Sequence, residues 1–218
     1  MKAGANPFSS TWQTVTALAQ APTPKSRRRR QQLLEAAAAE FIDKGYFGAS
    51  IREIAERADA RPSTIYYHFA SKEDLVIAVH ERGIALIHQA TADAINDFDE
   101  PWQRLEAACI AHLNALLGGD VIFRAVMREM PRLFKPETQD RLRALRDSYE
   151  LIFVQLLDDL VLPRGTDRHT LRLMLLGAMN WSFTWYRPGR DTPSELAVKF
   201  VRNLRIELGI EERRDNEA

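Results

Sequence analysis

The chain has 218 residues, with 30 basic and 30 acidic side chains, 45% hydrophobic residues and a single cysteine, Cys109. This composition supports a substantial core and excludes an intramolecular disulfide or a thiolate metal cluster. No apolar run approaches the roughly 20 residues that span a bilayer, and the N-terminus lacks a signal-peptide pattern. We therefore expect a soluble, cytoplasmic protein without a membrane partner.

The neutral total charge hides an asymmetry along the chain. Residues 1–72 carry 11 basic against 6 acidic side chains, whereas residues 73–218 carry 19 against 24. A basic N-terminal third indicates an anionic partner for that part of the chain.

Apolar residues recur every three or four positions and strand-like alternation is absent, which predicts an all-α fold. Residues 1–24 form an N-terminal tail that is either a short extra helix or a disordered arm. The run "SRRRR" at 26–30 precedes the first confident helix. It is either a solvated charge run or a segment that reaches DNA phosphates and a flanking minor groove.

Two short helices follow the first long one, which spans about 25–44 and ends at Gly45. The second helix begins at Ser50, where "SIRE" is a capping box: the Ser50 hydroxyl accepts the Glu53 N–H and the Glu53 side chain reaches back. A third, very short helix begins at Pro62, which suits the first helical position. Two short helices joined by a tight turn are typical of a helix-turn-helix. The second of them is too short to be stable alone.

The third helix, "PSTIYYH", has two faces. Ile65 and Phe69 are four residues apart and are expected to pack inward on the second helix. The other side chains of this stretch offer hydroxyl and imidazole donors for phosphates, and rings for sugars or thymine methyl groups. They are Ser63, Thr64, Tyr67 and His68, with Tyr66 at the margin.

Residues 27–75 resemble the DNA-binding domain of the TetR family of one-component repressors. The resemblance lies in "AAAAEFIDKGYFGA" and "SIREIAERADARPSTIYYHFASKEDL", with their aromatic-Gly turn at 46–48, "TIYYHF" core at 64–69 and "SKEDL" start of the fourth helix. It implies that the chain binds double-stranded operator DNA. The implied phosphate contacts come from Ser50, Arg52, Tyr67, His68 and Lys72. The implied base-edge or groove contacts come from Arg61, Pro62, Ser63 and Thr64, with Tyr66 close to the DNA backbone.

Two positions depart from the family pattern. Asp59 stands where the turn usually has Gly, and Asp tolerates the left-handed conformation better than most residues. Arg61 stands where a small N-cap is common, so the short helix loses a cap, and we expect Arg61 to touch guanine or phosphate. Ordinary structural roles stay open for four of the ten implied DNA contacts: Tyr66 as core, His68 as a structural histidine, and Arg52 and Lys72 as solvated charges.

The second half of the sequence predicts a helical bundle, which brings the expected total to about nine helices. After a fourth helix that follows Ser71, further helices are predicted near 101–118, 120–129, 137–162, 168–187 and 192–209. The expected domains are a helix-turn-helix domain at 25–75, a ligand-binding and dimerisation bundle at 76–210 and a tail at 211–218. In the TetR family the last two long helices form a homodimer, which implies a partner face at Leu173, Leu176, Gly177 and Trp181.

The candidate effector site lies in this bundle. The candidate lining residues have polar tips or soft side chains on helices expected to surround a cavity, and each could equally be ordinary core or interface. They are His112, Met127, Tyr149, Asn180 and Trp181. The segment "LLGAMNWSFTWYRPG" also resembles TetR regulators of lipid and steroid catabolism, some of which sense acyl-CoA thioesters.

The sequence contains no metal-spaced histidine pair and no nucleophile, Walker or dinucleotide motif, so no enzyme activity, cofactor or metal is expected. The leading hypothesis is a homodimeric transcriptional repressor, released from a palindromic operator by a small hydrophobic effector. An acyl-CoA thioester is one candidate effector. The alternative is a helical interaction module on the same fold that no longer binds an operator.

Overall fold

The computed structural model describes residues 23–128 and 134–210, and within these ranges the chain forms nine helices and no strand. The predicted all-α class is therefore confirmed, while the expectations for most of the N-terminal tail and for 211–218 lie outside the described residues. The helices are α1 (Pro24–Gly48), α2 (Ile51–Arg57), α3 (Pro62–His68), α4 (Lys72–Ile95), α5 (Pro101–Leu117), α6 (Val121–Arg128), α7 (Pro136–Asp158), α8 (Arg168–Trp185) and α9 (Pro193–Glu207).

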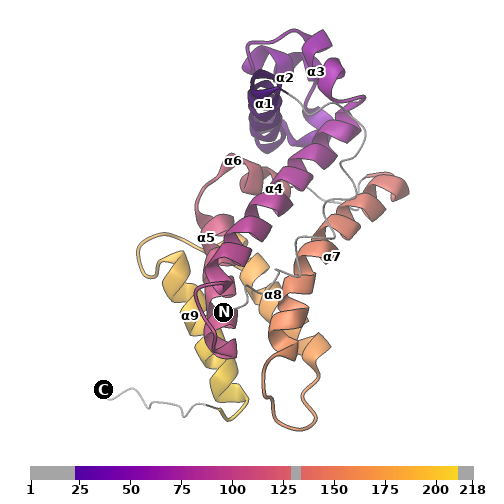
Figure 1. Cartoon of the computed structure of the whole chain (residues 1–218). Coiled ribbons are helices and arrows are strands. Elements are labelled where there is room, and N and C mark those ends of the chain that lie inside the picture. Colours follow the sequence, from indigo (N-terminus) through magenta and orange to yellow (C-terminus); the bar gives the residue numbers. More distant parts are fainter. Residues whose placement is uncertain (1–22, 129–133, 211–218) are drawn as a thin grey trace.

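The helices separate into two parts joined by α4 (Figure 1). Helices α1–α3 form one end of the molecule. At the other end, α5 and α7 pack on α4, α9 packs on α5, and α8 packs on α5 and α7. The 24 residues of α4 extend about 36 Å at the helical rise of 1.5 Å per residue. Helix α6 packs against both α1 and α4, so the bundle touches the N-terminal domain directly as well as through α4.

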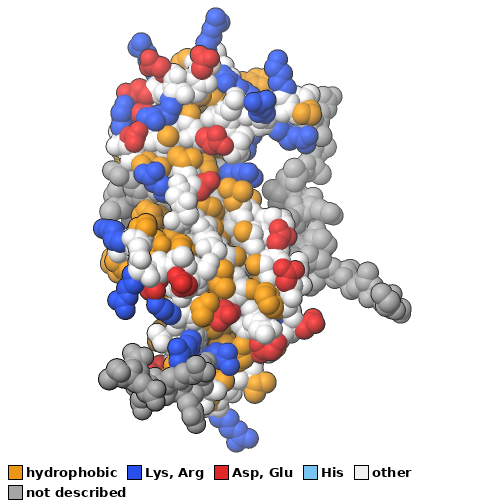
Figure 2. Space-filling view, turned by 90° about the vertical axis from the view of Figure 1, so that its left-hand side faces the viewer, with side chains coloured by type: hydrophobic (Ala, Val, Ile, Leu, Met, Phe, Trp, Pro, Cys, Tyr) orange, Lys and Arg blue, Asp and Glu red, His pale blue; other side chains and the backbone are white. Residues whose placement is uncertain are grey.

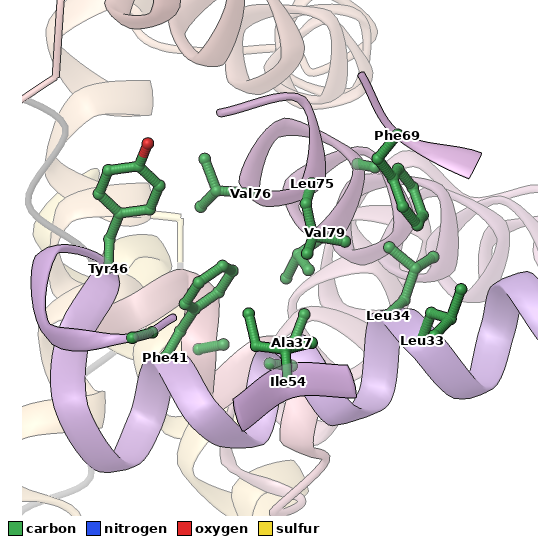
Figure 3. Close-up of a cluster of buried hydrophobic side chains, with 14 of the residues drawn as sticks. Leu33, Leu34, Ala37, Phe41, Tyr46, Ile54, Phe69, Leu75, Val76 and Val79 are labelled. Carbon is green, nitrogen blue, oxygen red and sulfur yellow. The ribbon is translucent and has the colours of Figure 1, made fainter. Parts of the chain in front are cut away.

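The core of the N-terminal domain comes from helices whose apolar residues recur at helical spacing (Figure 3). Leu33, Leu34 and Phe41 of α1 are almost completely buried against Ile54 of α2 and Leu75 of α4. Burial of large aliphatic and aromatic side chains is the main stabilising contribution to so small a domain. The same cluster includes Ile122 and Ala125 of α6, so α6 contributes to the core of the N-terminal domain.

The ends of α1 and α7 differ most from the sequence-based boundaries. Helix α1 continues to Gly48, but it is kinked at Gly45, whose φ of 69° breaks the helical path where the C-cap was predicted. Helix α7 ends at Asp158 instead of 162. The Arg168 guanidinium, at the start of α8, donates to the carbonyl oxygens of Leu157 and Leu160, both at 2.9 Å, and these bonds satisfy orphan carbonyls at the end of α7.

The bundle has its own core, built around α5, α7 and α8. Cys109 is fully buried in it, and burial raises the pKa of its thiol, which makes the thiol unreactive. In the described part of the chain no single helix is long and apolar enough to cross a membrane. One bent helix pair, Pro101–Leu117 with Val121–Met127, matches by length and composition only.

Candidate functional site

The turn between α2 and α3 holds a residue in the left-handed conformation. Asp59 has φ of 47°, its N–H donates to Glu56 O at 3.0 Å and the Ala60 N–H donates to Ala55 O at 2.8 Å. These two bonds form a Schellman motif, which normally has Gly at the left-handed position. The turn survives the replacement of Gly by Asp, as the sequence predicted.

The basic run before the core of α1 divides into two pairs. The Arg29 guanidinium donates to Ala58 O at 3.1 Å and to Asp59 O at 2.8 Å, and the Arg30 guanidinium lies 5.1 Å from the centre of the Phe69 ring. Both side chains therefore support the helix-turn-helix. Arg27 and Arg28 are exposed and have no partner among the described residues, so both guanidinium groups are available to a ligand.

Helix α3 presents the two predicted faces. Ile65 is completely buried and Phe69 is 5% exposed, whereas Tyr66 and Tyr67 are 56% and 82% exposed. The alternative that Tyr66 is core packing is therefore wrong. Arg61 precedes the helix without a side-chain cap bond, and Pro62 occupies its first turn. The polar groups available on the outward face are those of Arg61, Ser63, Thr64, Tyr66 and Tyr67.

His68, at the end of α3, is half-buried with its ring edge-to-face with Tyr67 at 5.0 Å between centroids. Burial, and then the positive charges of Arg30 and Arg29, lower the pKa of its imidazole below 6.5. The ring is therefore neutral at pH 7 and can give one N–H to a phosphate oxygen without bringing a charge.

The three other implied phosphate contacts differ in how much of their bonding capacity is used. Arg52 on α2 is exposed and has no partner within the described ranges. The Ser50 hydroxyl accepts the Glu53 N–H at 3.2 Å and donates to the Glu53 carboxylate at 2.7 Å, so the carboxylate reaches back to the Ser50 side chain. Lys72 Nζ donates to Tyr46 O at 2.8 Å and Ala49 O at 2.9 Å, and lies 4.4 Å from the Tyr46 ring centre. Lys72 is therefore an anchor between α1 and α4 and not a solvated charge.

Charged side chains gather on the surface of the N-terminal domain. Figure 2 shows Lys and Arg side chains projecting from the upper end of the molecule, which α1–α3 form, with acidic side chains between them. Part of this acidic charge is paired locally: Glu40 and Asp43 of α1 bind Arg57 of α2 at 3.0 and 2.6 Å. Exposed cations without an ion-pair partner among the described residues remain at the start of α1, at Arg52 of α2 and at Arg61 before α3.

The bundle contains a cavity of about 540 Å³ between α4, α5, α6, α7 and α8. Its walls are largely aliphatic and aromatic, from side chains such as Ile84, Ile87, Phe123 and Leu142, which is the usual character of a small-molecule site. Four of the five predicted ligand residues line it: His112, Met127, Tyr149 and Asn180. The structure thus brings together residues from four different helices.

A chain of hydrogen bonds crosses the wall of this cavity. Thr91 Oγ1 lies 3.1 Å from the Tyr149 hydroxyl, which lies 3.0 Å from His112 Nδ1, and His112 Nε2 lies 3.1 Å from Asn180 Oδ1. Burial lowers the pKa of His112 to about 4 and raises that of Tyr149. Both side chains are therefore neutral at pH 7, and this part of the cavity wall offers polarity without charge.

Both regions match known protein families. Residues 33–79 match the model described as "Bacterial regulatory proteins, tetR family", and residues 99–206 match "Tetracyclin repressor-like, C-terminal domain". The chain belongs to the TetR family. Its relatives are transcriptional regulators and not enzymes, in agreement with the absence of a catalytic motif in the sequence.

The TetR relatives cover most of the chain. The HTH-type transcriptional activator FasR of Mycolicibacterium smegmatis is 28% identical over 78% of this chain and 78% of its own. The HTH-type transcriptional repressor KstR2 of Mycobacterium tuberculosis is 26% identical over 74% of this chain and 82% of its own. The crystal structure of AibR in complex with isovaleryl coenzyme A and operator DNA superposes with a TM-score of 0.69, at 26% identity, over 79% of this chain and 96% of that one.

Two TetR bundle residues were assigned to the wrong surface. Trp181 was predicted both in the cavity and on the partner face; it is 66% exposed and does not line the cavity, so only the cavity assignment is wrong. Leu176, predicted on the partner face, is 4% exposed and lines the cavity. Five residues correspond to about 140° around an α-helix, so the two cannot share a face. The exposed apolar face of α8 is instead formed by Leu173, Met174, Trp181 and Trp185.

The sequence analysis missed several cavity residues. His80 and Gly83 of α4 line the cavity, and α7 contributes a polar edge made by Gln139, Arg143, Arg146 and Glu150. The spacing of four, three and four residues places these α7 positions on one stripe of the helix. Tyr149 lies on the neighbouring stripe with Leu142 and Leu145, so helical periodicity measured from Tyr149 finds Arg146 but not the other three.

Proposed function

We propose that this TetR-family chain is a homodimeric, ligand-responsive repressor that binds a palindromic operator and leaves it when a small hydrophobic effector occupies the bundle cavity. The observation that carries the proposal is the division of α3: two buried anchors fix the helix, and its opposite face presents exposed polar and aromatic side chains to a partner. A short helix held in this way is suited to the major groove.

The proposed contacts follow the exposure of each side chain. Arg61, Pro62, Ser63 and Thr64 face base edges, and Arg61, as the one cation among them, pairs with guanine or phosphate. Arg52, Tyr67 and His68 bind phosphates, with Tyr66 beside the DNA backbone. Ser50 and Lys72 reach phosphates only in addition to the intramolecular bonds that they already make. These two therefore act mainly by positioning α2 and α4.

Dimerisation through α8 and α9 is supported by the exposed apolar face of α8. Leu173, Met174, Trp181 and Trp185 recur at helical spacing and remain between 46% and 66% exposed. At Gly177, on the same face, a Cβ would meet nothing within 4 Å. A contiguous apolar face of this kind marks an interaction surface, and a two-fold partner would place two α3 helices about 34 Å apart, one turn of DNA.

An acyl-CoA thioester is a candidate effector. AibR, at 26% identity, is described in complex with isovaleryl coenzyme A. In this chain the cavity suits an acyl group. Arg143 and Arg146 at its edge are exposed, and to bind phosphate they would exchange their carboxylate partners for phosphate oxygens. Effector binding would act on the DNA-binding domain through α4 and α6, to the extent that the effector prefers one of the two states.

The alternative, an interaction module that no longer binds an operator, draws support only from the uncapped start of α3 at Arg61. DNase footprinting of the purified protein on the DNA flanking its own gene separates the two proposals. A repressor protects two related half-sites and loses this protection when a medium-chain acyl-CoA is added. An interaction module protects no sequence at physiological salt.

A further inference from the structure

The cavity carries hydrogen-bonding groups at two separate places, with apolar walls between them. One is Asn180 of α8, backed by the hydrogen-bond chain through His112 and Tyr149 to Thr91. The other is His80, on the part of α4 nearest the DNA-binding domain. Thr91, the last residue of that bond chain, lies about 16 Å along α4 from His80. Asn180 is linked to Thr91 through two further side chains, so the Asn180 amide and His80 belong to different parts of the cavity lining.

The Asn180 end presents a donor to the cavity. Asn180 Oδ1 is an acceptor, so His112 Nε2 carries the ring proton, and the neutral ring leaves Nδ1 to accept from the Tyr149 hydroxyl. The Tyr149 oxygen in turn accepts from Thr91. These bonds leave the Asn180 amide N–H groups without a partner among the described residues. Asn180 is exposed, and a ligand group that replaces solvent at these N–H groups is an acceptor, such as a carbonyl or hydroxyl oxygen.

The His80 end is incomplete without a ligand. His80 is 8% exposed and lines the cavity, and its Nε2 is buried with no hydrogen-bond partner. Burial lowers the pKa of the ring to about 4, so the imidazole is neutral and can either donate or accept. The imidazole ring turns easily about its terminal side-chain torsion, and this rotation changes which ring atoms face the cavity. Buried polar groups without partners are rare in native proteins.

The edge of the cavity adds little net charge. Arg143 is paired with Asp140 at 2.9 Å, and Arg146 lies 3.5 Å from both Asp147 and Glu150. Glu150 is also held by Arg172 of α8. A charged group inside the cavity would therefore be desolvated without a counter-charge, which is strongly unfavourable.

We propose that the part of the effector held inside the cavity is an uncharged, elongated apolar group with two oxygen functions, an acceptor for the Asn180 amide and a second hydroxyl or carbonyl for His80. This inference rests on the proposed effector site and names its ligand class. A medium-length chain with a hydroxyl or oxo substituent far from its thioester or ester carbonyl meets both requirements. His80 is the specificity residue, and because it lies on α4, its bond to the effector acts on the helix that carries the DNA-binding domain.

The test uses the full-length protein and linear probes titrated by isothermal calorimetry. 1,8-octanediol, 1,10-decanediol and 1,12-dodecanediol place two hydroxyls at increasing separations. 1-Decanol has one hydroxyl, and decanedioate has two carboxylates. We expect the best diol to bind about fivefold to tenfold more tightly than the mono-alcohol, the gain from one added hydrogen bond, and decanedioate to bind most weakly. Tighter binding of decanedioate, or no measurable binding of any diol, would overturn the proposal.

Two variants assign the second oxygen to His80. In His80→Leu the diol should lose its advantage over 1-decanol, while the affinity for 1-decanol changes by less than about twofold, because the mono-alcohol uses the Asn180 end. His88→Gln, on the same helix but outside the cavity, should keep the diol preference. An equal loss for both probes in His80→Leu would show that the residue only shapes the cavity.

A stability measurement excludes a merely structural role for His80. Because the ring has no partner for Nε2, His80→Leu should leave the melting temperature unchanged or raise it, whereas loss of a satisfied structural histidine would lower it. If the diols bind no more tightly than 1-decanol while acyl-CoA still releases the protein from its operator, this inference alone is refuted. If the wild-type protein binds no operator, the proposed function is refuted. The probe titrations then still test the ligand class of the cavity.

Discussion

The Arg29 guanidinium donates to the Asp59 carbonyl oxygen at 2.8 Å, joining α1 to the turn between α2 and α3. Asp59 is the residue with φ of 47°, and a second bond from Arg29, to Ala58 O, flanks it at 3.1 Å. An arginine from a run that looks like a DNA-binding tail is thus part of the helix-turn-helix itself. The position of α3 depends on this contact.

Replacing Arg29 should affect stability, whereas replacing its neighbour Arg28 should not. Arg29→Ala removes two charge-assisted bonds to the turn, and an exposed one to Gln32, and should lower the free energy of unfolding by about 1–3 kcal/mol. Arg28→Ala, which removes an exposed side chain with no partner in the described ranges, should stay within about 0.5 kcal/mol of wild type. Urea unfolding followed by circular dichroism measures both. Equal effects of the two substitutions would contradict the division of the basic run.

The left-handed turn residue offers a substitution that should stabilise the domain. Asp59→Gly keeps the two Schellman bonds and the Arg29 contact, since all of these use the backbone, and it removes the Cβ strain of the left-handed conformation. We expect a gain of up to about 1 kcal/mol, and a loss for Asp59→Val, whose branched side chain is poorly tolerated at positive φ. The midpoint of urea unfolding should move in opposite directions for the two variants.

Acidification should weaken the fold through its buried histidines. His80 and His112 have pKa values lowered from 6.5 to about 4, so between these pH values the unfolded chain binds protons that the folded chain does not. Stability is fully present above pH 6.5 and falls as the pH approaches 4. Each histidine should lower the free energy of unfolding by about 2 kcal/mol between pH 7 and pH 5. Unfolding curves measure the drop in the free energy of unfolding between pH 7 and pH 5. This drop should be smaller by about 2 kcal/mol in His80→Leu than in the wild-type protein.

The apolar face of α8 leads to a prediction about oligomeric state. Trp181→Glu introduces a charge into the proposed interface and should convert the dimer to a monomer in light scattering after size exclusion. Because Trp181 is 66% exposed in the single chain, the helical circular dichroism signal should be retained. A matched charge at Val161, 91% exposed on a loop, should leave the dimer intact. A Trp181→Glu protein that remains dimeric would place the interface elsewhere.

Local patterns predicted the helix-turn-helix well because its residues interact over short sequence distances. The cap at Ser50, the inward pair Ile65 and Phe69 and the turn at Asp59 all follow from spacing and residue type. The cavity was only partly predictable. His112, Tyr149 and Asn180 were found by polarity, but their mutual hydrogen bonds join positions 37 and 68 residues apart, and no local pattern encodes such contacts.

Two errors have the same origin. Leu176 and Trp181 were placed on one face, although helical geometry separates them, and His80 was weighed only as a metal ligand. In both cases the role of the residue depends on which neighbour covers its side chain, and this depends on how α4, α7 and α8 pack. The sequence pattern shows that a helix has two faces but does not show which of them meets the cavity.

The most direct test of the central claim is the affinity of wild-type protein and two variants for operator DNA, measured by fluorescence anisotropy at several salt concentrations. The DNA is the region flanking the protein's own gene. Arg52→Ala removes an exposed cation beside α3, whereas Arg164→Ala removes an exposed cation from a loop of the bundle. We predict that Arg52→Ala weakens binding and lowers the slope of log K against log salt by about one, while Arg164→Ala matches wild type. Equal affinities and slopes for all three proteins would contradict the account.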